Sequence, residues 1–437
     1  MAAARLLAVL LCGAMGAGAH AESLVEAYEA ARSYDAPLQS AQAAYDASVS
    51  RAEQLRAGLL PSVGLSASAL RSLTDFTTGI VRNNTTQSVG VNGAQPLYRP
   101  ANRLALEQGQ RQLDIFRAAL DAAVQDLQVR VSQSYFDVLG AQDTLNFVRA
   151  QKTAVAEQRA SAQRNFEVGT ATVTDSREAQ ARYDLVIAQE IGAENDLRVK
   201  RLALDQLLGR AGVSPRPLAQ PVALPELPLE SLNEWVDRSQ QYQPAVRQAQ
   251  LALDVARLEI QKAETGHLPT VDLVAGYNVQ RFPNGSQTIS GAYRSNASSV
   301  GVQLNMPLFS GFAVQNRVKE TLSLADKAEF DLDTTRRSVA QQTRALFFGA
   351  VSSAGQARAL EAAEASSQSA LDANKLGYQV GVRINIDVLN AQSQLYQTKR
   401  DLAQARYSVL LSNLRLRQSA GVLDTQHLHE INALLEP

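Results

Sequence analysis

The sequence of 437 residues has a single cysteine, Cys12, and aromatic side chains make up only 5% of it. Cys12 lies in an apolar N-terminal stretch that ends in the tripeptide AHA at Ala21, a small-x-small pattern typical of a signal-peptide cleavage site. We therefore expect residues 1–21 to be removed on export, which leaves the mature chain without disulfide or thiol chemistry. A lipid anchor at Cys12 is not expected, because the preceding residue is Leu11, where a small residue is required.

The sequence also lacks the features of enzymes and of nucleic-acid-binding proteins. The formal net charge is −1, so no basic excess indicates a nucleic acid as partner. We find no Gly-rich nucleotide loop, no cluster of metal ligands and no convergent acid–base pair, and we expect neither catalysis nor a cofactor. His427 and His429 have ligand-like spacing, but they lie in a polar tail, where we expect them to be solvated.

Long hydrophobic runs are absent after the N-terminal stretch. A membrane-spanning helix needs about 18 or more consecutive apolar residues, and the mature sequence has no such run. Two alternatives remain: a protein that is soluble beyond the inner membrane, and a protein that is inserted into a membrane as strands.

The residues that are present form a tandem repeat. The stretch NFEVGTATVTD, which ends at Asp175, returns as LGYQVGVRINID, which ends at Asp387. Leu60-Pro61 likewise returns as Leu268-Pro269. We assign residues 22–210 to the first repeat and 230–424 to the second, with a stiff proline-rich linker at 211–229 between them and a C-terminal tail at 425–437.

Each repeat is predicted to contain a helix, two strands, a very long helix and a shorter return helix. The long helix has two rows of apolar residues that recur every seven residues, such as Leu113, Leu120 and Leu127, which is typical of a left-handed coiled coil. At 1.5 Å per residue it spans on the order of 100 Å, about the length of two shorter helices placed end to end. In the first repeat we expect a helix at about 23–58, strands at about 62–73 and 86–98, the long helix at 101–168 and the return helix at 175–209. In the second repeat we expect strands at about 270–281 and 297–309, the long helix at 312–379 and the return helix at 387–420.

The predicted strands alternate between apolar and small polar residues. In SVGLSASAL, the side chains of Val63, Leu65 and Ala67 point one way and those of the serines the other. This pattern is typical of transmembrane β-strands, although a soluble sheet that covers a core also shows it. Four strands cannot close a barrel, and lipid cannot satisfy the backbone of an open edge. Several chains must therefore share one barrel: two would give eight strands, and three would give twelve with room for a pore.

The duplication, the PLFSG stretch from Pro307 to Gly311 and the paired Val-Gly…Asp turns resemble the TolC family of outer-membrane channel-tunnels. The resemblance covers essentially all of the mature chain. It implies a mainly helical homotrimer, in which a 12-stranded membrane β-barrel continues as a 12-helix-strand α-helical coiled-coil tunnel into the periplasm. The linker and the tail would lie in a mixed equatorial region.

The resemblance further implies a passive exit duct in the cell outer membrane, part of a tripartite efflux pump or a type I secretion system. Its partners would be outer-membrane lipid, a periplasmic adaptor (membrane fusion) protein and an inner-membrane pump of the RND, ABC or MFS type. The duct would open at its periplasmic tip when docked to them. The sequence does not specify the substrate. The rival hypothesis is a soluble periplasmic coiled-coil scaffold or interaction protein, against which the alternating strands argue.

The two echoing turns would lie at this tip, and in the family the tip is a gate. The resemblance implies that Tyr378 bonds to Asp175 and that Arg383 bonds to the region of Thr174, which would hold the tip closed. It also implies that Asp387, repeated by threefold symmetry, forms an acidic ring in the constriction. Close carboxylates raise one another's pKa and attract cations. Where the family often has a second acid one turn later, this sequence has Asn390, so we expect a single ring that binds cations more weakly.

The residues of the turns also have structural interpretations. Asp175 and Glu178 match a capping box, and Asp387 could cap the next helix. Gly169 and Gly381 suit the left-handed position that ends a helix, and the same turns could be what an adaptor contacts. Outside the turns, Tyr98, Phe309 and Phe312 lie just beyond the strands, where they fit either an interfacial aromatic belt or packing at the junction of strand and helix.

Overall fold

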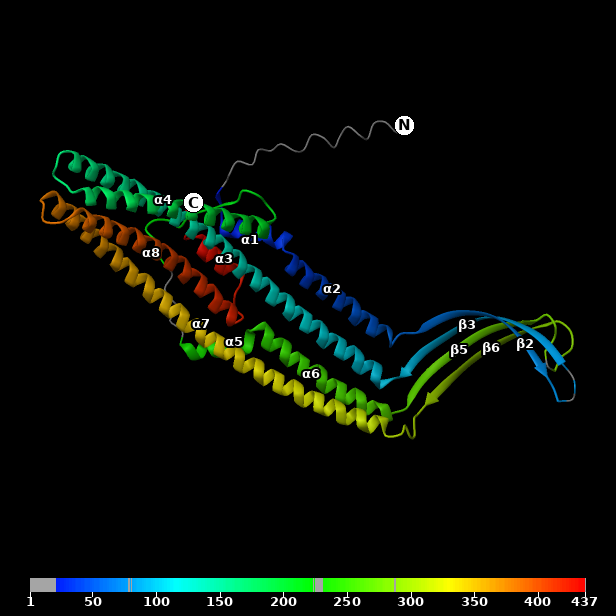
Figure 1. The fold of residues 1–437 in the computed structure, drawn as a ribbon. Coiled ribbons are helices and arrows are strands. Elements are labelled where there is room, and N and C mark those ends of the chain that lie inside the picture. The colour runs from blue at the N-terminus through cyan, green and yellow to red at the C-terminus, as the bar shows by residue number, and fades with distance from the viewer. Residues whose placement is uncertain are drawn as a thin grey trace, which may run out of the picture. The chain divides into compact units, whose positions relative to one another are not determined.

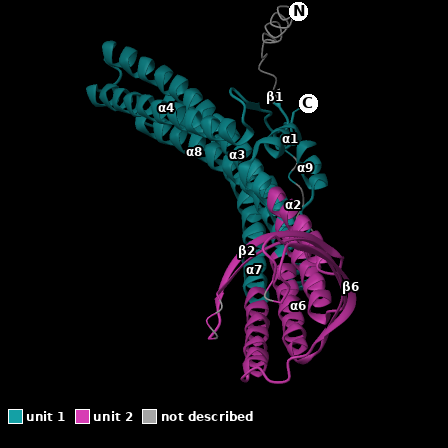
Figure 2. Ribbon diagram, turned by 90° about the vertical axis from the view of Figure 1, so that its right-hand side faces the viewer, with its two compact units in different colours: residues 1–41, 120–244, 336–437 teal, residues 42–119, 245–335 magenta. Residues whose placement is uncertain are grey.

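The structure is a computed structural model in which residues 21–437 are described, except for Thr78, Ile80, Ala223, Gln287, Pro437 and the segment 225–230. The expected signal peptide, apart from Ala21, and residues 225–230 of the expected linker therefore lie outside the described residues. The chain divides into two compact units (Figure 2). Residues 1–41, 120–244 and 336–437 form the first, which we call the helical unit, and residues 42–119 and 245–335 form the second, which we call the sheet unit.

The two halves of the chain contain matching series of elements (Figure 1). The first half forms α1 (Leu24–Tyr34), α2 (Ala36–Ala57), β2 (Ser62–Asp75), β3 (Val81–Tyr98), α3 (Pro100–Glu167) and α4 (Val173–Leu208). The second half forms α5 (Leu232–Tyr242), α6 (Pro244–Glu264), a short 3-10 helix η1 (Thr265–His267), β5 (Thr270–Phe282), β6 (Tyr293–Asn305), α7 (Ala313–Gln379) and α8 (Asn385–Ser419). Two short strands, β1 (Ala21–Glu22) and β4 (Ser214–Pro215), and the terminal helix α9 (Thr425–Asn432) complete the fold. Among the described residues, no helix is both long enough and apolar enough to cross a membrane.

The first helix of the repeat, expected as one piece over 23–58, is two helices. The chain is extended at Asp35, and the carboxylate of Asp35 accepts a hydrogen bond from the Leu38 backbone N–H at 3.0 Å. The break follows from Pro37, which has no N–H to donate to the preceding turn and clashes with a continuing helix. In the second repeat the break lies at Gln243, directly before Pro244.

The four long strands form one antiparallel sheet in the order β2-β3-β5-β6. β3 and β5 join the two repeats, so β2 and β6 are the edges of the sheet. The strand expected at 297–309 is shifted, because β6 begins at Tyr293 and ends at Asn305. Pro307 explains the early end, since proline cannot donate to the ladder. β3 begins at Val81, earlier than the expected residue 86, because it pairs with β2 along its whole outer part.

The register of the sheet separates apolar from polar side chains. One row across three strands contains Leu65, Val91 and Tyr277, and the adjacent row, which points to the other face, contains Gly64, Asn92 and Gly276. The apolar face is exposed in the single chain, with Val63 76% and Val300 79% exposed. A sheet with so much exposed apolar surface needs an apolar environment.

The helical unit has the largest core of the chain. Its centre is α3, where Leu127, Val131, Val138 and Leu145 of the predicted seven-residue rows are buried. Buried residues from four other helices pack around it: Leu24 and Tyr28 of α1, Leu197 and Leu204 of α4, Leu410 and Leu414 of α8, and Leu428 and Ile431 of α9.

The C-terminal tail is part of this core, although His429 is exposed, as expected. Leu428 is fully buried, and His427 takes part in the capping box of α9 with Asp424. Beyond α9 the chain pairs with the linker: the Ala219 N–H donates to the Leu434 carbonyl at 2.9 Å. Leu428 and Ile431 are three residues apart, a spacing that places both on one face of a helix. This pattern was the signal in the sequence that the tail packs against a core.

Candidate gate at the paired helical turns

The two echoing turns, both in the helical unit, have the same backbone conformation. Gly169 and Gly381 have φ values of 81° and 78°, in the left-handed region. In the first turn the N–H groups of two residues donate to the Asn165 carbonyl, and in the second turn two donate to the Gly377 carbonyl. These bonds satisfy carbonyls at the end of each long helix, and glycine adopts the required φ without strain. Both glycines are exposed, which leaves the turns open to a partner.

The helices that follow the turns begin differently. α4 begins with a capping box, in which the Asp175 N–H donates to the Thr172 hydroxyl at 3.2 Å and the Thr172 N–H donates to the Asp175 carboxylate at 3.0 Å. α8 has Ile384 at the corresponding position, and no side chain caps it. The box expected from Asp175 and Glu178 therefore begins at Thr172, and Asp387 is not a cap. The Asp387 carboxylate is left available for other roles.

A group of hydrogen bonds joins the second turn and α8 to the α3–α4 hairpin. Each bond uses the side-chain amide of an asparagine or glutamine, and we call the group the amide clamp. Asn385 is at its centre and is only 1% exposed. The bonds run from Asn165 Nδ2 to the Tyr378 hydroxyl (3.1 Å), from Gln158 Nε2 to Asn385 Oδ1, from Asn385 Nδ2 to the Asp175 carbonyl (3.4 Å) and from Arg182 Nη2 to Asn390 Oδ1 (2.8 Å).

Apolar packing supports the clamp on both sides. Leu389 of α8 is fully buried among Val155, Ala162, Ala179 and Val186 of α3 and α4. Its neighbour Val388 is buried against Leu371 of α7. The first turns of α8 are thus held between α7 and the α3–α4 hairpin.

Within the single chain, the residues of the expected closing bonds have other partners. Tyr378 bonds to Asn165 instead of Asp175, because the Asp175 carboxylate is engaged by Thr172. Arg383 pairs with Asp387 at 3.7 Å, and Thr174 is exposed. Within the described part of the chain, no bond links Tyr378 to Asp175 or Arg383 to Thr174. The two hairpins are joined at the expected place, but through Asn385.

Asp387 and Asn390 lie on the first two turns of α8, as the sequence predicts. The Asp387 side chain is 34% exposed, and its nearest cation is Arg383. Asn390 is exposed and accepts from the Arg182 guanidinium, so a positive charge stands where the family often has a second acid. The negative charge of Asp387 is therefore partly offset by the nearby Arg182, whereas a second acid would have added to it.

The aromatic residues beyond the strands are exposed in the single chain. Phe309 and Phe312 contact each other edge to face, with ring centroids 5.4 Å apart. Phe312 has a φ of 65°, rare for a residue with a side chain. Tyr98 is also exposed, at the end of β3.

Sequence reasoning missed the central residue of the clamp. Asn385 corresponds in the duplication to Val173, so a buried amide stands where the other repeat has an apolar, exposed side chain. A difference of this kind between two repeats was the available signal. Asn165, Gln158 and Arg182 carry no signal of their own, because polar residues are common along the exposed faces of both hairpins.

Known proteins resemble this chain over nearly its full length. The family model described as outer membrane efflux protein matches residues 27–210 and 235–422. The chain belongs to this family. It is 34% identical over 431 residues to the outer membrane protein TolC of Vibrio cholerae serotype O1, covering 97% of this chain and 96% of that protein. It is 31% identical over 426 residues to the alkaline protease secretion protein AprF of Pseudomonas aeruginosa, covering 95% of this chain and 88% of that protein.

Solved structures of similar fold are also outer-membrane channels. The transmembrane channel CusC matches with a TM-score of 0.79 at 17% identity, over 92% of both chains. The outer membrane protein VceC of Vibrio cholerae matches with a TM-score of 0.77 at 18% identity, over 91% of this chain and 96% of that one.

The resemblance to the TolC family is confirmed, as is the mainly helical fold with two tandem repeats and a small sheet. This outer membrane efflux protein is an exit duct located in the outer membrane. The alternative of a soluble periplasmic scaffold does not agree with this assignment.

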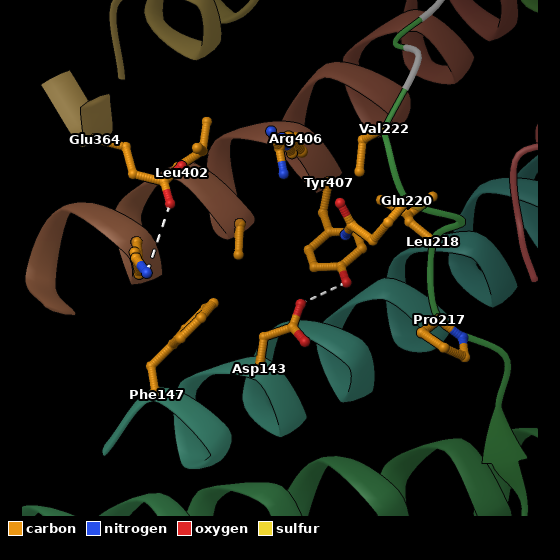
Figure 3. A pocket seen from close by; sticks show the side chains of 12 residues that line it. Asp143, Phe147, Pro217, Leu218, Gln220, Val222, Glu364, Leu402, Arg406 and Tyr407 are labelled. Atoms are coloured by element: carbon orange, nitrogen blue, oxygen red, sulfur yellow. Dashed lines mark hydrogen bonds and ion pairs between the residues drawn. The ribbon is translucent and has the colours of Figure 1, made fainter. Parts of the chain in front are cut away.

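A second polar site of the efflux protein lies in the helical unit around Asp143 (Figure 3). The Tyr407 hydroxyl donates to Asp143 at 2.7 Å, beside a cavity of about 310 Å³ that Leu218 and Gln220 of the linker help to line. Burial raises the pKa of the Asp143 carboxyl, and the hydrogen bond from Tyr407 and the charge of Arg406 only partly oppose the rise. Burial and the nearby Asp143 also raise the pKa of the Tyr407 hydroxyl.

The raised pKa of the Asp143 carboxyl makes the free energy of unfolding depend on pH. An acid with a raised folded pKa contributes stability below its unfolded pKa, about 3.9, and the contribution is lost as the pH rises through the folded pKa. Asp143→Asn keeps the shape of the side chain and still accepts the hydrogen bond from the Tyr407 hydroxyl, but it removes the buried charge. We therefore expect the variant to unfold at a temperature about 2–4 °C higher than the parent at pH 7. The difference should vanish near pH 3. Thermal unfolding followed by circular dichroism measures it, with Asp372→Asn on the exposed surface of α7 as control. A less stable Asp143→Asn protein at pH 7 would contradict the assigned burial effect.

Proposed function

We propose that three copies of this chain form one duct, with the strands in the outer membrane and the helical hairpins in the periplasm. The supporting observation is the sheet. It has an exposed apolar face, and on their outer sides the edge strands β2 and β6 have no neighbour among the described strands. In lipid these edges need partners, and β6 of one copy with β2 of the next is the pairing that closes a cylinder. Three copies of four strands give about twelve strands, enough for an aqueous lumen. The linker and the tail, paired through Leu218 and Leu435, would form the equatorial region.

The duct itself performs no catalysis and takes its energy from a partner. In this proposal the periplasmic tip is closed at rest, and it opens when a periplasmic adaptor and an inner-membrane pump dock. The exposed turns at Gly169 and Gly381 are the surfaces that the adaptor contacts. The family is described as outer membrane efflux protein and one relative is named as an alkaline protease secretion protein, so both efflux and protein secretion suit the same duct. The pump, and not this chain, would decide between them.

The amide clamp supports the closed state. It joins α8 to the α3–α4 hairpin within one chain, through Asn385 and Arg182. Tyr378 contributes through its bond to Asn165, whereas Arg383 pairs with Asp387 inside the second turn and the start of α8. For the tip to open, α8 and α7 must separate from α3 and α4, and the clamp opposes this separation. Asp387 forms the acidic ring of the constriction, and Arg182 beside Asn390 reduces the negative field one turn away.

The test of the constriction is cation block of single-channel current in planar bilayers. We expect Asp387→Ala to raise the divalent-cation concentration needed for half block by at least about tenfold, because even in water-like screening each carboxylate near a divalent ion contributes about 1 kcal/mol or more. Asn390→Asp should lower that concentration. Asp372→Ala, an exposed acid of α7, is the control and should leave block unchanged. Block that is the same in Asp387→Ala and the parent would exclude Asp387 from the constriction.

The oligomeric state is tested separately, by native mass spectrometry of the full chain in detergent. A mass of three copies is expected. A stable single copy would contradict the proposal, because its sheet edges would then have to be satisfied by lipid or detergent alone.

A further inference from the structure

Two arginines face each other directly across neighbouring strands of the sheet unit. Arg281 of β5 and Arg294 of β6 are Cα partners in the antiparallel register. Side chains at such positions have Cβ atoms about 4.5–5.5 Å apart, and like charges there destabilise a sheet. Both side chains are exposed. A like-charge pair in a regular ladder, here next to its hairpin end, needs a compensating anion.

The described part of the chain does not supply this anion. Arg294 Nε bonds to the neutral Asn296, and the side chain of Arg281 has no hydrogen bond or ion pair with any described residue. The strands and hairpins over 62–98 and 270–305 contain only two acids, Asp75 and Asp272. Asp272 lies near the helix end of β5, where it pairs with Arg99 at 2.6 Å. Asp75 lies at the far end of β2 and forms no ion pair with either arginine in the described part.

The pair lies on the apolar face, at the hairpin ends of the strands. Counting in steps of two from Tyr277 along β5 reaches Arg281, so both side chains point to the same face as the apolar row. Arg71 is on this face as well and is also exposed, but it lies on β2, two strands away from β5 and one row further out. At the other end of each strand the chain joins the helices (Figure 1). The arginines therefore border the apolar band on the side away from the helices.

We propose that Arg281 and Arg294 form a binding site for the phosphate groups of a lipid headgroup in the outer leaflet of the membrane. Guanidinium groups bind phosphate through two parallel hydrogen bonds, and two of them side by side match a doubly charged phosphate monoester. The apolar face beside them accommodates the acyl chains of the same molecule. The shared surface explains why a like-charge pair is placed here: the membrane provides its counter-ion.

The inference rests on the proposed function in one respect, the placement of the hairpin ends at the outer surface of the membrane. Both tests below use the purified full chain and measure binding or unfolding, not export. A failure of lipid binding with an intact trimer would thus overturn this inference alone, whereas a failure to form trimers would overturn the proposed function.

The first test measures lipid binding by native mass spectrometry in a neutral detergent, with lipid A and its two phosphates as the probe. The double variant Arg281→Gln/Arg294→Gln should bind at least about tenfold more weakly, since charge-assisted bonds to phosphate are lost. Arg82→Gln is the matched control, because Arg82 lies on β3 at the same end of the sheet but on the opposite face. It should bind as the parent does. Dephosphorylated lipid A should bind the parent no better than it binds the double variant.

Two results would overturn the assignment. Equal binding of lipid A by the parent and the double variant would exclude the arginine pair. Inorganic phosphate that displaces lipid A at comparable concentration would show a site for a free anion instead of a lipid.

The second test uses the sign of a stability change. In neutral detergent without anionic lipid, the double variant should unfold at a higher temperature than the parent, because the repulsion is removed. Addition of lipid A should raise the unfolding temperature of the parent more than that of the variant. If the variant is less stable in neutral detergent, and lipid A raises its unfolding temperature as much as that of the parent, the arginines stabilise the sheet and do not bind a ligand.

Discussion

Replacing Asn385 with alanine is expected to open the periplasmic tip, so that single-channel conductance rises several-fold while the protein still folds and inserts. Asn385 is buried and bonds to Gln158 of α3 and to the Asp175 carbonyl of α4. Its removal leaves these groups without a partner, at a cost of about 1–3 kcal/mol in the closed state. Because 1.4 kcal/mol corresponds to a factor of about ten, the population of open tips should increase on the order of tenfold.

Two further variants sharpen this test. Asn374→Ala removes an amide that bonds only to its own helix, and should leave conductance unchanged. Asn385→Asp places a carboxylate at the buried position, where ionisation is opposed by burial. We expect this variant to be open at neutral pH and to close as the pH falls and the carboxyl is protonated. If Asn385→Ala has the conductance of the parent, the clamp does not hold the tip closed.

The clamp also predicts how tip opening in the parent protein depends on salt. Ion pairs at a surface weaken in salt, because the Debye length shortens to about 3 Å at 1 M. Three of the four bonds of the clamp join neutral groups and carry no such dependence, and the bond from Arg182 ends on the neutral Asn390. The probability of spontaneous opening should therefore change little between low and high ionic strength, once conductance is corrected for the concentration of the permeant ion.

The second large effect is expected at the join between α1 and α2. Arg130 of α3 makes a bidentate bond to Asp35, with both distances 2.9 Å, and the Asp35 side chain is only 4% exposed. Arg130→Met keeps the volume but leaves a buried carboxylate without its counter-ion. We expect a loss of about 3 kcal/mol in the free energy of unfolding. Denaturant unfolding of the full chain, followed by the helix signal in circular dichroism, measures it.

The pH dependence separates the lost charge pair from lost packing. The hydrogen bonds from the Arg130 guanidinium lower the pKa of Asp35 below its usual value. An acid with a lowered folded pKa contributes stability above its unfolded pKa, about 3.9, and the contribution is lost as the pH falls through the folded pKa. The difference in the free energy of unfolding between the parent and Arg130→Met should therefore become smaller below about pH 4. Arg149→Met, at an exposed ion pair with Glu194, is the control and should change stability little. A gap that stays constant with pH would indicate packing alone.

The architecture could be predicted from the sequence because apolar residues recur at simple intervals in its strands and long helices. Strict alternation predicted which face of the sheet is apolar, and rows every seven residues predicted the buried face of α3, where Val131 and Val138 are almost fully buried. The turns at Gly169 and Gly381 were visible because a left-handed φ limits the choice of residue. These signals are local in the chain, so they do not depend on partners far away in the sequence.

The closing bonds were not predictable in this way. Asp175 can bond to a neighbour in its own turn or to Tyr378, and the nearby Thr172 hydroxyl and N–H decide in favour of the turn. Asn385 is indistinguishable from a solvated asparagine until the packing of Leu389 fixes the rotation of α8. Side-chain pairing across hairpins depends on that rotation, which no local pattern encodes. The packing of the tail through Leu428 was missed for the same reason.

The pairing of β3 with β5 has a consequence for how such a protein could arise. This ladder joins two strands from different repeats, yet it is antiparallel and regular like the ladders inside each hairpin. An edge that accepts a neighbour from the same polypeptide would accept one from a separate polypeptide equally well. A gene for a single repeat could thus have encoded the same wall in shorter pieces, with twice as many copies around the axis. Fusion of two such genes would halve the number of molecules that must meet, and would allow the two halves to acquire different residues at the same place.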